Sequence, residues 1–326
     1  MQGDTVKPDP TSESAGGPNV GRPAATKGPA SWPSAGPHSL GESSNVLVRR
    51  GVGIRHGLQA LQAIVMRELF KFSRQTGRLV SALVRPLLWL AVFAAGFRNV
   101  FGIAIVEPYD TYIPYDVYIV PGLVGMVLLF NGMQSSLAMV YDREMGLMRL
   151  LLTAPLPRPW LLFSKLCATA LLSVLQALAF VVVALLIGTD LPLFSLAGLH
   201  ALLALTGSAL MLGALGLLLS VYIKQLENFA GTMNFVIFPM YFLSTALYPL
   251  WKLRESGAEW VYQLARFNPF THAVEWVRFA LYGKDPGAAP YVVLGCLAVF
   301  FTLACWGYDP QRGFGGLTKR GGGGGG

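Results

Sequence analysis

Six long apolar runs, separated by shorter polar and charged segments, dominate the chain between residues 79 and 306. The runs are rich in Leu, Val, Ala, Phe and Gly and lack the alternation of barrel strands, so helices are predicted. A bilayer core of about 30 Å takes roughly 20 helical residues, and the runs are long enough to supply them. The predicted spans are 79–97, 117–140, 166–187, 194–221, 229–249 and 289–306.

The composition supports a membrane protein. Hydrophobic residues make up 53% of the chain and charged residues only 13%, against about 25% charged in an ordinary soluble domain. The composition therefore excludes a water-soluble globule, which would lack a polar surface.

The distribution of Lys and Arg predicts the orientation of the spans. Basic residues gather before the first span, between spans two and three, between four and five, and after the sixth. By the positive-inside rule these parts, and both termini, are cytoplasmic. The segment between spans five and six also carries five basic residues, so the rule holds by majority only. The net charge of +8 follows mainly from this asymmetry, and no nucleic-acid partner is expected.

The two ends of the chain differ from the middle. Residues 1–57 begin with a Pro-, Gly- and Ser-rich tract that has few large apolar residues, and they are predicted to form a disordered cytoplasmic tail. Residues 310–326 are predicted to form a second cytoplasmic tail, which ends in a run of glycines. The transmembrane domain is therefore placed at 58–309.

The segment just before the first span has an amphipathic helical pattern with basic residues on its polar edge. Such a helix suits the cytoplasmic interface, beside anionic lipid headgroups. The alternative, a helix packed on a cytosolic domain, is less favoured because no such domain is present in this sequence. The apolar face consists of Leu58, Leu61, Val65, Leu69 and Phe72.

The segment 141–159, between spans two and three, is charged and amphipathic and too short to fold alone. Asp142 and Arg149 offer charges, while Met148 and Leu152 belong to an apolar ridge at helical spacing. The pattern predicts a short helix that docks into a groove of a cytosolic partner and ends at the prolines that follow. The alternative is an ordinary connecting loop.

The segment 251–283, after span five, is amphipathic but too polar to cross a membrane. Asn268 and Pro269 predict a helix break, and Glu275 and Arg278 lie three residues apart on the helix that follows. Two readings remain open: a helix pair that dips into the outer leaflet and returns, or an extracellular loop with a surface helix.

Several polar residues lie inside the predicted spans. Those with short side chains cannot reach water easily, and they either form interhelical hydrogen bonds or face a substrate. They are Asn131, Gln134 and Ser135 in span two, and Asn228 and Asn234 in span five. Arg85 in span one is expected to snorkel to the cytoplasmic headgroups. Small residues on span four are expected to let a neighbouring helix approach closely; these are Ala209, Gly213, Gly216 and Ser220.

No catalytic, cofactor or metal site is expected on this chain. The three cysteines have neither pairing nor ligand spacing for zinc or a disulfide framework. A Gly-x-x-x-x-Gly-Lys-Ser/Thr loop is absent from the sequence, so nucleotide binding is not predicted.

Taken together, these motifs resemble the ABC-2 type permeases of ABC transporters over about 58–309. The resemblance rests on the amphipathic helix, the six spans, the Asp-Arg-Glu-x-Gly segment at 142–146, and the Pro, Ser, Tyr-Pro, Asn-Pro, Glu and Arg series after span five. It implies an all-α membrane protein with six transmembrane helices, an N-terminal interfacial elbow helix, a cytoplasmic coupling helix and an outer re-entrant helix pair before the last span.

The same resemblance implies an exporter subunit in a bacterial inner membrane, with ATP and Mg²⁺ bound by a separate ATPase subunit. The expected partners are that ATPase, a second permease subunit in a homodimer, and membrane lipid. The resemblance assigns contact with the ATPase to Asp142, Arg143, Glu144, Gly146, Met148, Arg149, Leu152 and Pro155.

Four phrases, at 84–90, 131–136, 224–230 and 308–312, are most similar to the branch of the family associated with pyrroloquinoline quinone-dependent alcohol oxidation. Two other functions remain as alternatives to the exporter: an ion-coupled secondary transporter and a non-transporting membrane assembly factor. The first would ordinarily carry carboxylates in mid-membrane or related repeats, and neither is found within the six runs.

Overall fold

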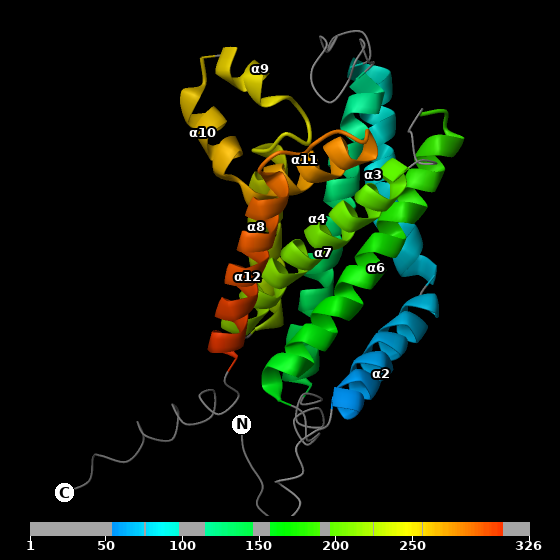
Figure 1. The fold of residues 1–326 in the computed structure, drawn as a ribbon, viewed down its shortest axis with the longest axis vertical. Helices are drawn as coiled ribbons and strands as arrows, with labels where there is room; N and C mark the ends of the chain where they lie inside the picture. Colours follow the sequence, from blue (N-terminus) through cyan, green and yellow to red (C-terminus); the bar gives the residue numbers. More distant parts are fainter. Residues whose placement is uncertain are drawn as a thin grey trace, which may run out of the picture. The chain divides into compact units, whose positions relative to one another are not determined.

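The computed structural model describes residues 54–74, 76–97, 115–145, 157–189, 196–223, 225–255 and 257–308, which form helices joined by turns and contain no strand. These residues confirm the predicted all-α class. Most of the predicted tails lies outside them, although the first helix begins at Ile54, slightly before the predicted boundary at 58. The helices in Figure 1 are α2 (Ile54–Ser73), α3 (Thr76–Phe97), α4 (Tyr115–Glu144), α6 (Arg158–Leu186), α7 (Leu196–Tyr222), α8 (Leu226–Phe242), α9 (Leu250–Glu255), α10 (Glu259–Phe267), α11 (Pro269–Leu281) and α12 (Ala289–Gly307).

Four of the described helices are long and apolar enough to cross a membrane, and they confirm a multi-pass membrane protein. They provide the candidate spans Val117–Glu144, Arg158–Leu186, Gly198–Tyr222 and Ala289–Gly307. The predicted spans one and five fall on α3 and α8, but α3 holds only the shorter apolar stretch Leu83–Phe93 and α8 has 17 residues. The count of six spans therefore stays a prediction.

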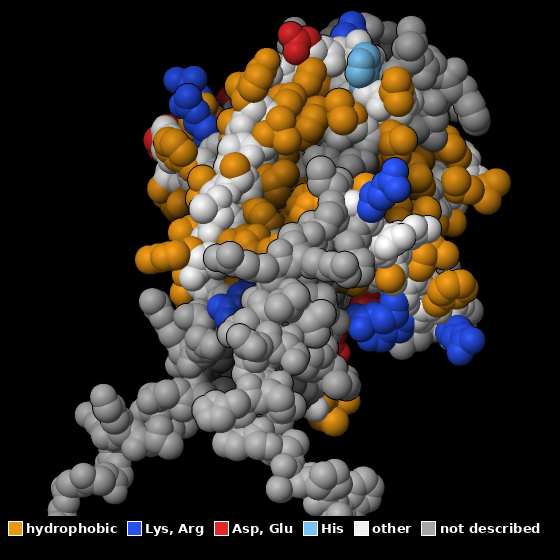
Figure 2. All heavy atoms as spheres, turned by 60° about the horizontal axis from the view of Figure 1, so that its bottom comes forward, with side chains coloured by type: hydrophobic (Ala, Val, Ile, Leu, Met, Phe, Trp, Pro, Cys, Tyr) orange, Lys and Arg blue, Asp and Glu red, His pale blue; other side chains and the backbone are white. Residues whose placement is uncertain are grey.

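Large apolar side chains cover the outside of these helices. Leu186, Tyr291 and Trp306 expose 82%, 79% and 77% of their surface, and Figure 2 shows hydrophobic side chains over much of the visible flank. A soluble protein seldom exposes apolar surface so extensively. The exposure fits the lipid contact expected of membrane helices.

Contacts near the helix ends show that α4 runs antiparallel to α3, α6 and α8. The ring of Phe93 near the end of α3 lies 5.9 Å from the ring of Tyr115 at the start of α4. The Tyr115 hydroxyl donates to the carbonyl of Leu247, just after α8, at 2.7 Å. Lys165 near the start of α6 lies 3.3 Å from Asp142 near the end of α4.

The helices α7 and α12 run parallel to α4. Ser220 near the end of α7 approaches Met139 of α4, and Gly307 at the end of α12 packs against Val221 and Tyr222 of α7. The six helices that correspond to the predicted spans thus alternate in direction along the chain, as consecutive membrane spans would; they are α3, α4, α6, α7, α8 and α12.

The helix α4 is central, because it packs against α3, α6, α7, α8 and α11. Its approach to α7 is close: a Cβ added at Gly216 would lie 2.5 Å from Ser136 Oγ and 2.8 Å from the carbonyl oxygen of Gly132. Only glycine fits there, since side chains on both helices would otherwise hold the backbones apart. The prediction that small residues of this span permit a close approach is confirmed.

The predicted helix break at Asn268 is present, since α10 ends at Phe267 and α11 begins at Pro269. The Asn268 side-chain oxygen accepts a hydrogen bond from Phe270 N at 2.9 Å and so caps α11. Its amide nitrogen donates to the carbonyls of Met240 and Leu243, each at 2.7 Å. One side chain therefore begins α11 and satisfies carbonyls at the end of α8.

The amphipathic helix α2 packs on α6. The indole nitrogen of Trp160 donates to the carbonyl of Gly57 at 2.9 Å, and a Cβ at Gly57 would meet the same ring at 3.3 Å. Most of the predicted apolar face is half-buried, whereas Met66 and Phe70 remain exposed. Apolar surface of α2 is thus left over after it has packed on α6.

Candidate functional site

The end of α4 carries three of the residues that the sequence assigned to a partner. Of the eight candidates, Asp142, Arg143 and Glu144 lie on the last turn of α4. The remaining five lie outside the described residues: Gly146, Met148, Arg149, Leu152 and Pro155. The structure therefore describes the end of α4 that leads into this segment. The helical conformation predicted for the segment itself stays a prediction.

An ion pair joins the two helices that flank the segment. Lys165 Nζ of α6 lies 3.3 Å from Asp142 Oδ2 of α4, and their side chains are only 10% and 15% exposed. A cavity of about 40 Å³ beside the pair is lined in part by Glu68 and Lys71 of α2. Removing one partner of such a buried pair typically costs about 3–5 kcal/mol, because the other charge is left uncompensated. The pair holds α4 and α6 together next to α2.

Glu144 makes a second link from the end of α4. Its Oε1 accepts a hydrogen bond from the backbone N–H of Leu226 at 2.8 Å. Leu226 is the first residue of α8, and Gln225 before it provides no side-chain cap. A carboxylate at this position satisfies an open N–H group and interacts favourably with the helix dipole. The sequence predicted that Glu144 faces a partner; the structure shows an exposed residue that also caps α8.

The end of α12 reaches the same region. Burial raises the pKa of the Tyr308 hydroxyl, and the positive charges of Arg143 and Arg158 act in the opposite direction. Tyr308 therefore lies near both the end of α4 and the start of α6. The charged end of the described helices gathers α2, α4, α6, α8 and α12, and it lies at the bottom of Figure 1.

The polar residues of the predicted spans separate into two groups. Asn131 is buried, and its amide donates to Gln176 Oε1 on α6, which is buried as well. For Asn131, this favours an interhelical hydrogen bond over a substrate contact. Gln134 and Ser135 are half-buried on α4. By contrast, the two candidates on α8 are exposed; they are Asn228 and Asn234.

Sequence reasoning missed Gln176 and Lys165 as partners. The available signal was a Gln inside the apolar run of α6 and a Lys near its start, since a polar side chain in a membrane helix needs a partner. Both lie opposite residues of α4 that had been singled out. Because α4 and α6 run antiparallel, Asn131 lies opposite Gln176 and Asp142 lies opposite Lys165.

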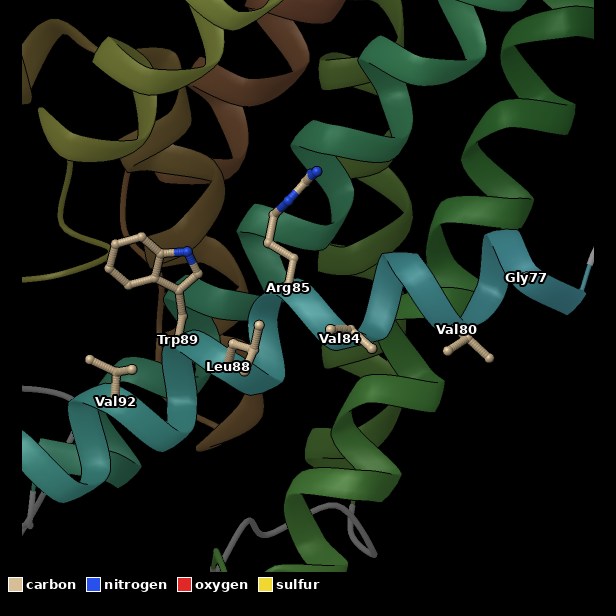
Figure 3. A pocket seen from close by; sticks show the side chains of 7 residues that line it. All are labelled: Gly77, Val80, Val84, Arg85, Leu88, Trp89 and Val92. Atoms are coloured by element: carbon tan, nitrogen blue, oxygen red, sulfur yellow. The ribbon is translucent and has the colours of Figure 1, made fainter.

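A groove runs along one face of α3 (Figure 3). Its volume is about 870 Å³, and the described residues that line it are Gly77, Val80, Val84, Arg85, Leu88, Trp89 and Val92. Arg85 and Trp89 extend to the same side of the helix in Figure 3. The guanidinium carbon of Arg85 lies 3.9 Å from the centre of the Phe130 ring of α4. The described lining of the groove is thus apolar apart from Arg85 at its edge.

Arg85 also lines a second, smaller cavity on the inner side of α3. This cavity has a volume of about 50 Å³ and is enclosed by α3, α4 and α6, with side chains that are more polar than those of the groove. Its lining residues are Arg85, Pro86, Met126, Val127, Phe130, Asn131, Gln134 and Gln176. Arg85 was expected to extend along α3 toward the cytoplasmic headgroups. Its guanidinium instead points toward α4, where it stacks on the Phe130 ring.

The residues predicted for the outer segment come together at the other end of α4. Arg278 of α11 is only 4% exposed. Its guanidinium donates to the carbonyl of Thr245 at 2.8 Å, and its Cζ lies 4.2 Å from the centre of the Tyr118 ring. Glu275 is half-buried one turn earlier on the same helix. The cation thus ties α11 to α4 and to the turn after α8.

Comparison with known proteins gives a consistent assignment. The family description "ABC-2 type transporter" matches residues 59–282. The transport permease ycf38 of Porphyra purpurea is 29% identical over 70% of this chain and 76% of its own length. The daunorubicin resistance ABC transporter permease protein DrrB1 of Streptomyces coeruleorubidus is 23% identical over 73% of this chain and 81% of its own. The inner membrane transport permease YadH of Escherichia coli K12 is 24% identical over 76% and 93%, respectively.

Proposed function

The chain belongs to the ABC-2 type transporter family, and we propose that this membrane permease is the translocation subunit of an ATP-driven exporter. In this proposal, ATP and Mg²⁺ bind to a separate ATPase subunit, and two copies of the permease pair in the membrane. The observation that carries the proposal is the arrangement around 146–156, where both flanking helices are anchored by charged contacts.

The geometry suits the transmission of a movement from a cytosolic partner. A force on the segment between α4 and α6 acts on the ion pair of Asp142 and Lys165, beside α2. It also acts on Glu144, and through Leu226 on the first turn of α8. Because the ion pair is largely buried and Glu144 caps α8 directly, the helices would move together with the segment. The eight coupling residues named from the sequence belong to this part of the chain.

The direction of transport and the membrane are proposed from the relatives. The name of DrrB1 refers to drug resistance and that of YadH to the inner membrane. We place this chain likewise in a bacterial inner membrane, as an exporter with both termini cytoplasmic. The elbow role of α2 and the re-entrant placement of α9–α11 in the outer leaflet belong to the same proposal. The exposed apolar residues of α2 and the capped break at Asn268 support them.

The ion-coupled alternative receives less support from the described helices. In the four candidate spans, the described carboxylates are Asp142 and Glu144, and both lie on the last turn of α4. An ion-coupled transporter usually places carboxylates near the middle of the membrane. The remaining alternative, an assembly factor, is separated from an exporter by experiment.

The test is retention of an ATPase. Purification of the tagged full-length chain should retain a nucleotide-binding subunit encoded beside it. Reversing the charge with Arg149→Glu should leave insertion and yield unchanged but weaken this association by about 1–3 kcal/mol, the range for a charge-assisted hydrogen bond. Arg254→Glu on α9, at the opposite end of the described helices, is the matched control. Undiminished retention by Arg149→Glu would contradict the coupling assignment.

We also propose membership of the branch associated with pyrroloquinoline quinone-dependent alcohol oxidation, which rests on the four phrases at 84–90, 131–136, 224–230 and 308–312. A quinoprotein dehydrogenase encoded next to this chain would support this branch. A neighbourhood that holds an ATPase and no such dehydrogenase would favour the family without the branch.

A further inference from the structure

Among the side chains of α3 that the structure describes, the exposed ones include four large apolar residues and a cation. Val80, Val84, Leu88 and Val92 are 58%, 45%, 61% and 57% exposed. Arg85 lies at the edge of this apolar stripe and remains exposed as well. An apolar face alone would suit any lipid tail, but a guanidinium on the same face adds a requirement for negative charge.

The position of Arg85 makes this cation unusual for a membrane helix. It lies six residues after the start of predicted span one at residue 79, which is about 9 Å along the axis at 1.5 Å per residue. The side chain stacks on Phe130 instead of extending along α3. Among the described residues, no carboxylate forms an ion pair with Arg85. A cation at this depth is costly unless an anion or water accompanies it.

The smaller cavity beside Arg85 provides further hydrogen-bonding groups. Asn131 and Gln176 are bonded to each other. The Gln134 amide also lines this cavity, and within the described ranges no hydrogen bond engages it. Its two N–H groups are therefore available to an acceptor. A cavity of about 50 Å³ has room for a small polar group but not for an apolar chain.

We infer that the face of α3 binds a lipid-like amphiphile with an anionic headgroup, with the headgroup at Arg85 and Gln134 and the apolar tail along Val84, Leu88 and Val92. The described residues of this face outline an open groove of about 870 Å³, in which an apolar chain can lie along the helix. The charge of Arg85 selects the headgroup. The occupant enters from the membrane, because the exposed apolar face opens toward the surroundings of the helices. Only the statement that this ligand is transported depends on the proposed function.

Trp89 supplies the measurement, because it lines the same groove. Its ring stacks on Phe93 at 5.2 Å and meets Phe242 edge-on at 6.2 Å, so that Trp89→Phe keeps an aromatic ring in place. The full-length protein is reconstituted into phosphatidylcholine vesicles that contain either dibrominated phosphatidylglycerol or dibrominated phosphatidylcholine at equal mole fraction. Bromine quenches indole fluorescence on contact. The difference between the native protein and Trp89→Phe isolates the signal of Trp89.

The anionic brominated lipid should quench Trp89 with about fivefold preference over the zwitterionic one, as expected of one basic side chain acting on one headgroup. Arg85→Gln should abolish the preference, Arg85→Lys should retain most of it, and Gln134→Leu should weaken it. The control Arg254→Gln, on α9, should leave the preference unchanged. The retained charge of Arg85→Lys separates loss of binding from loss of folding.

Equal quenching by the two lipids in the native protein would overturn the inference, and so would a preference that survives Arg85→Gln. A change of oligomeric state in Arg85→Gln without any lipid preference in the native protein would assign the groove to a second copy of this chain and would also overturn it. The assay needs no ATPase. Failure of the proposed coupling therefore leaves its result unaffected, and the two failures can be distinguished.

Discussion

Asn268 joins two helices with one side chain, and its two ends can be tested separately. Its oxygen caps α11 through Phe270 N, while its nitrogen donates to the carbonyls of Met240 and Leu243 at the end of α8. Asn268→Ala removes all three bonds. Asn268→Asp keeps an acceptor for the cap but replaces the donor with a second oxygen.

The magnitudes follow from these three bonds. Loss of a helix cap costs about 1 kcal/mol, and each of the two bonds to carbonyls contributes about 0.5–1.5 kcal/mol. Asn268→Ala should therefore destabilise the protein by about 2–4 kcal/mol. Asn268→Asp should cost at least as much, because the introduced carboxylate oxygen would face two carbonyl oxygens at the 2.7 Å positions now held by hydrogen bonds. Its better cap would not compensate.

Thermal unfolding of the purified protein, followed by intrinsic fluorescence, provides the assay. At an unfolding entropy of about 2 cal/mol/K per residue, a chain of 326 residues shifts its Tm by about 1.5 °C per kcal/mol. Asn268→Ala should therefore lower the apparent Tm by about 3–6 °C. The control is Asn228→Asp on the first turn of α8, because Asn228 is exposed and lies before the predicted span. If Asn268→Asp were as stable as the native protein, the cap alone would account for Asn268, and the link to α8 would be refuted.

Three further results are expected. Gly216→Ala should lower stability and yield, because its Cβ would lie 2.5 Å from a serine oxygen of α4. Gly231→Ala is the control and should be tolerated, because nothing lies within 4 Å of its Cβ position. Equal effects of the two variants in a thermal assay would contradict the close packing. Asp142→Asn and Lys165→Met should each cost about 3–5 kcal/mol but much less than their sum when combined; additive losses of stability would mean that the two charges act independently. A cysteine at Ala154, in a background without the native cysteines, should be shielded from an impermeant thiol reagent in intact cells, and labelling from outside would refute the six-span topology.

Local features of this chain could be read from its residues. Apolar runs of about 20 residues predict membrane helices because the bilayer thickness fixes their length. Asn268 followed by Pro269 predicts a helix break because a proline lacks an N–H and restricts the residue before it. Gly213 and Gly216 predict a close approach because they have no side chain. The structure confirms the helical class, the break and the close approach.

The candidate site depended on partners that lie far apart in the sequence. Asp142 was singled out as a charge for a partner, but Lys165 on the next helix binds it. Glu144 was assigned to the same partner, and it also caps α8, 82 residues later. From the sequence, Asn131 has two possible roles, an interhelical hydrogen bond or a substrate contact. Its hydrogen bond to Gln176 favours the first.

Composition, periodicity and backbone chemistry determine which residues form helices and where those helices stop, because these effects act over a few residues. The pairs formed by Asp142, Glu144 and Asn131 depend instead on which helices become neighbours and how far each is shifted along its axis. The packing of α4 against α6, α7 and α8 sets both. The tertiary structure alone therefore decided that Arg85 stacks on Phe130, at the edge of an apolar groove.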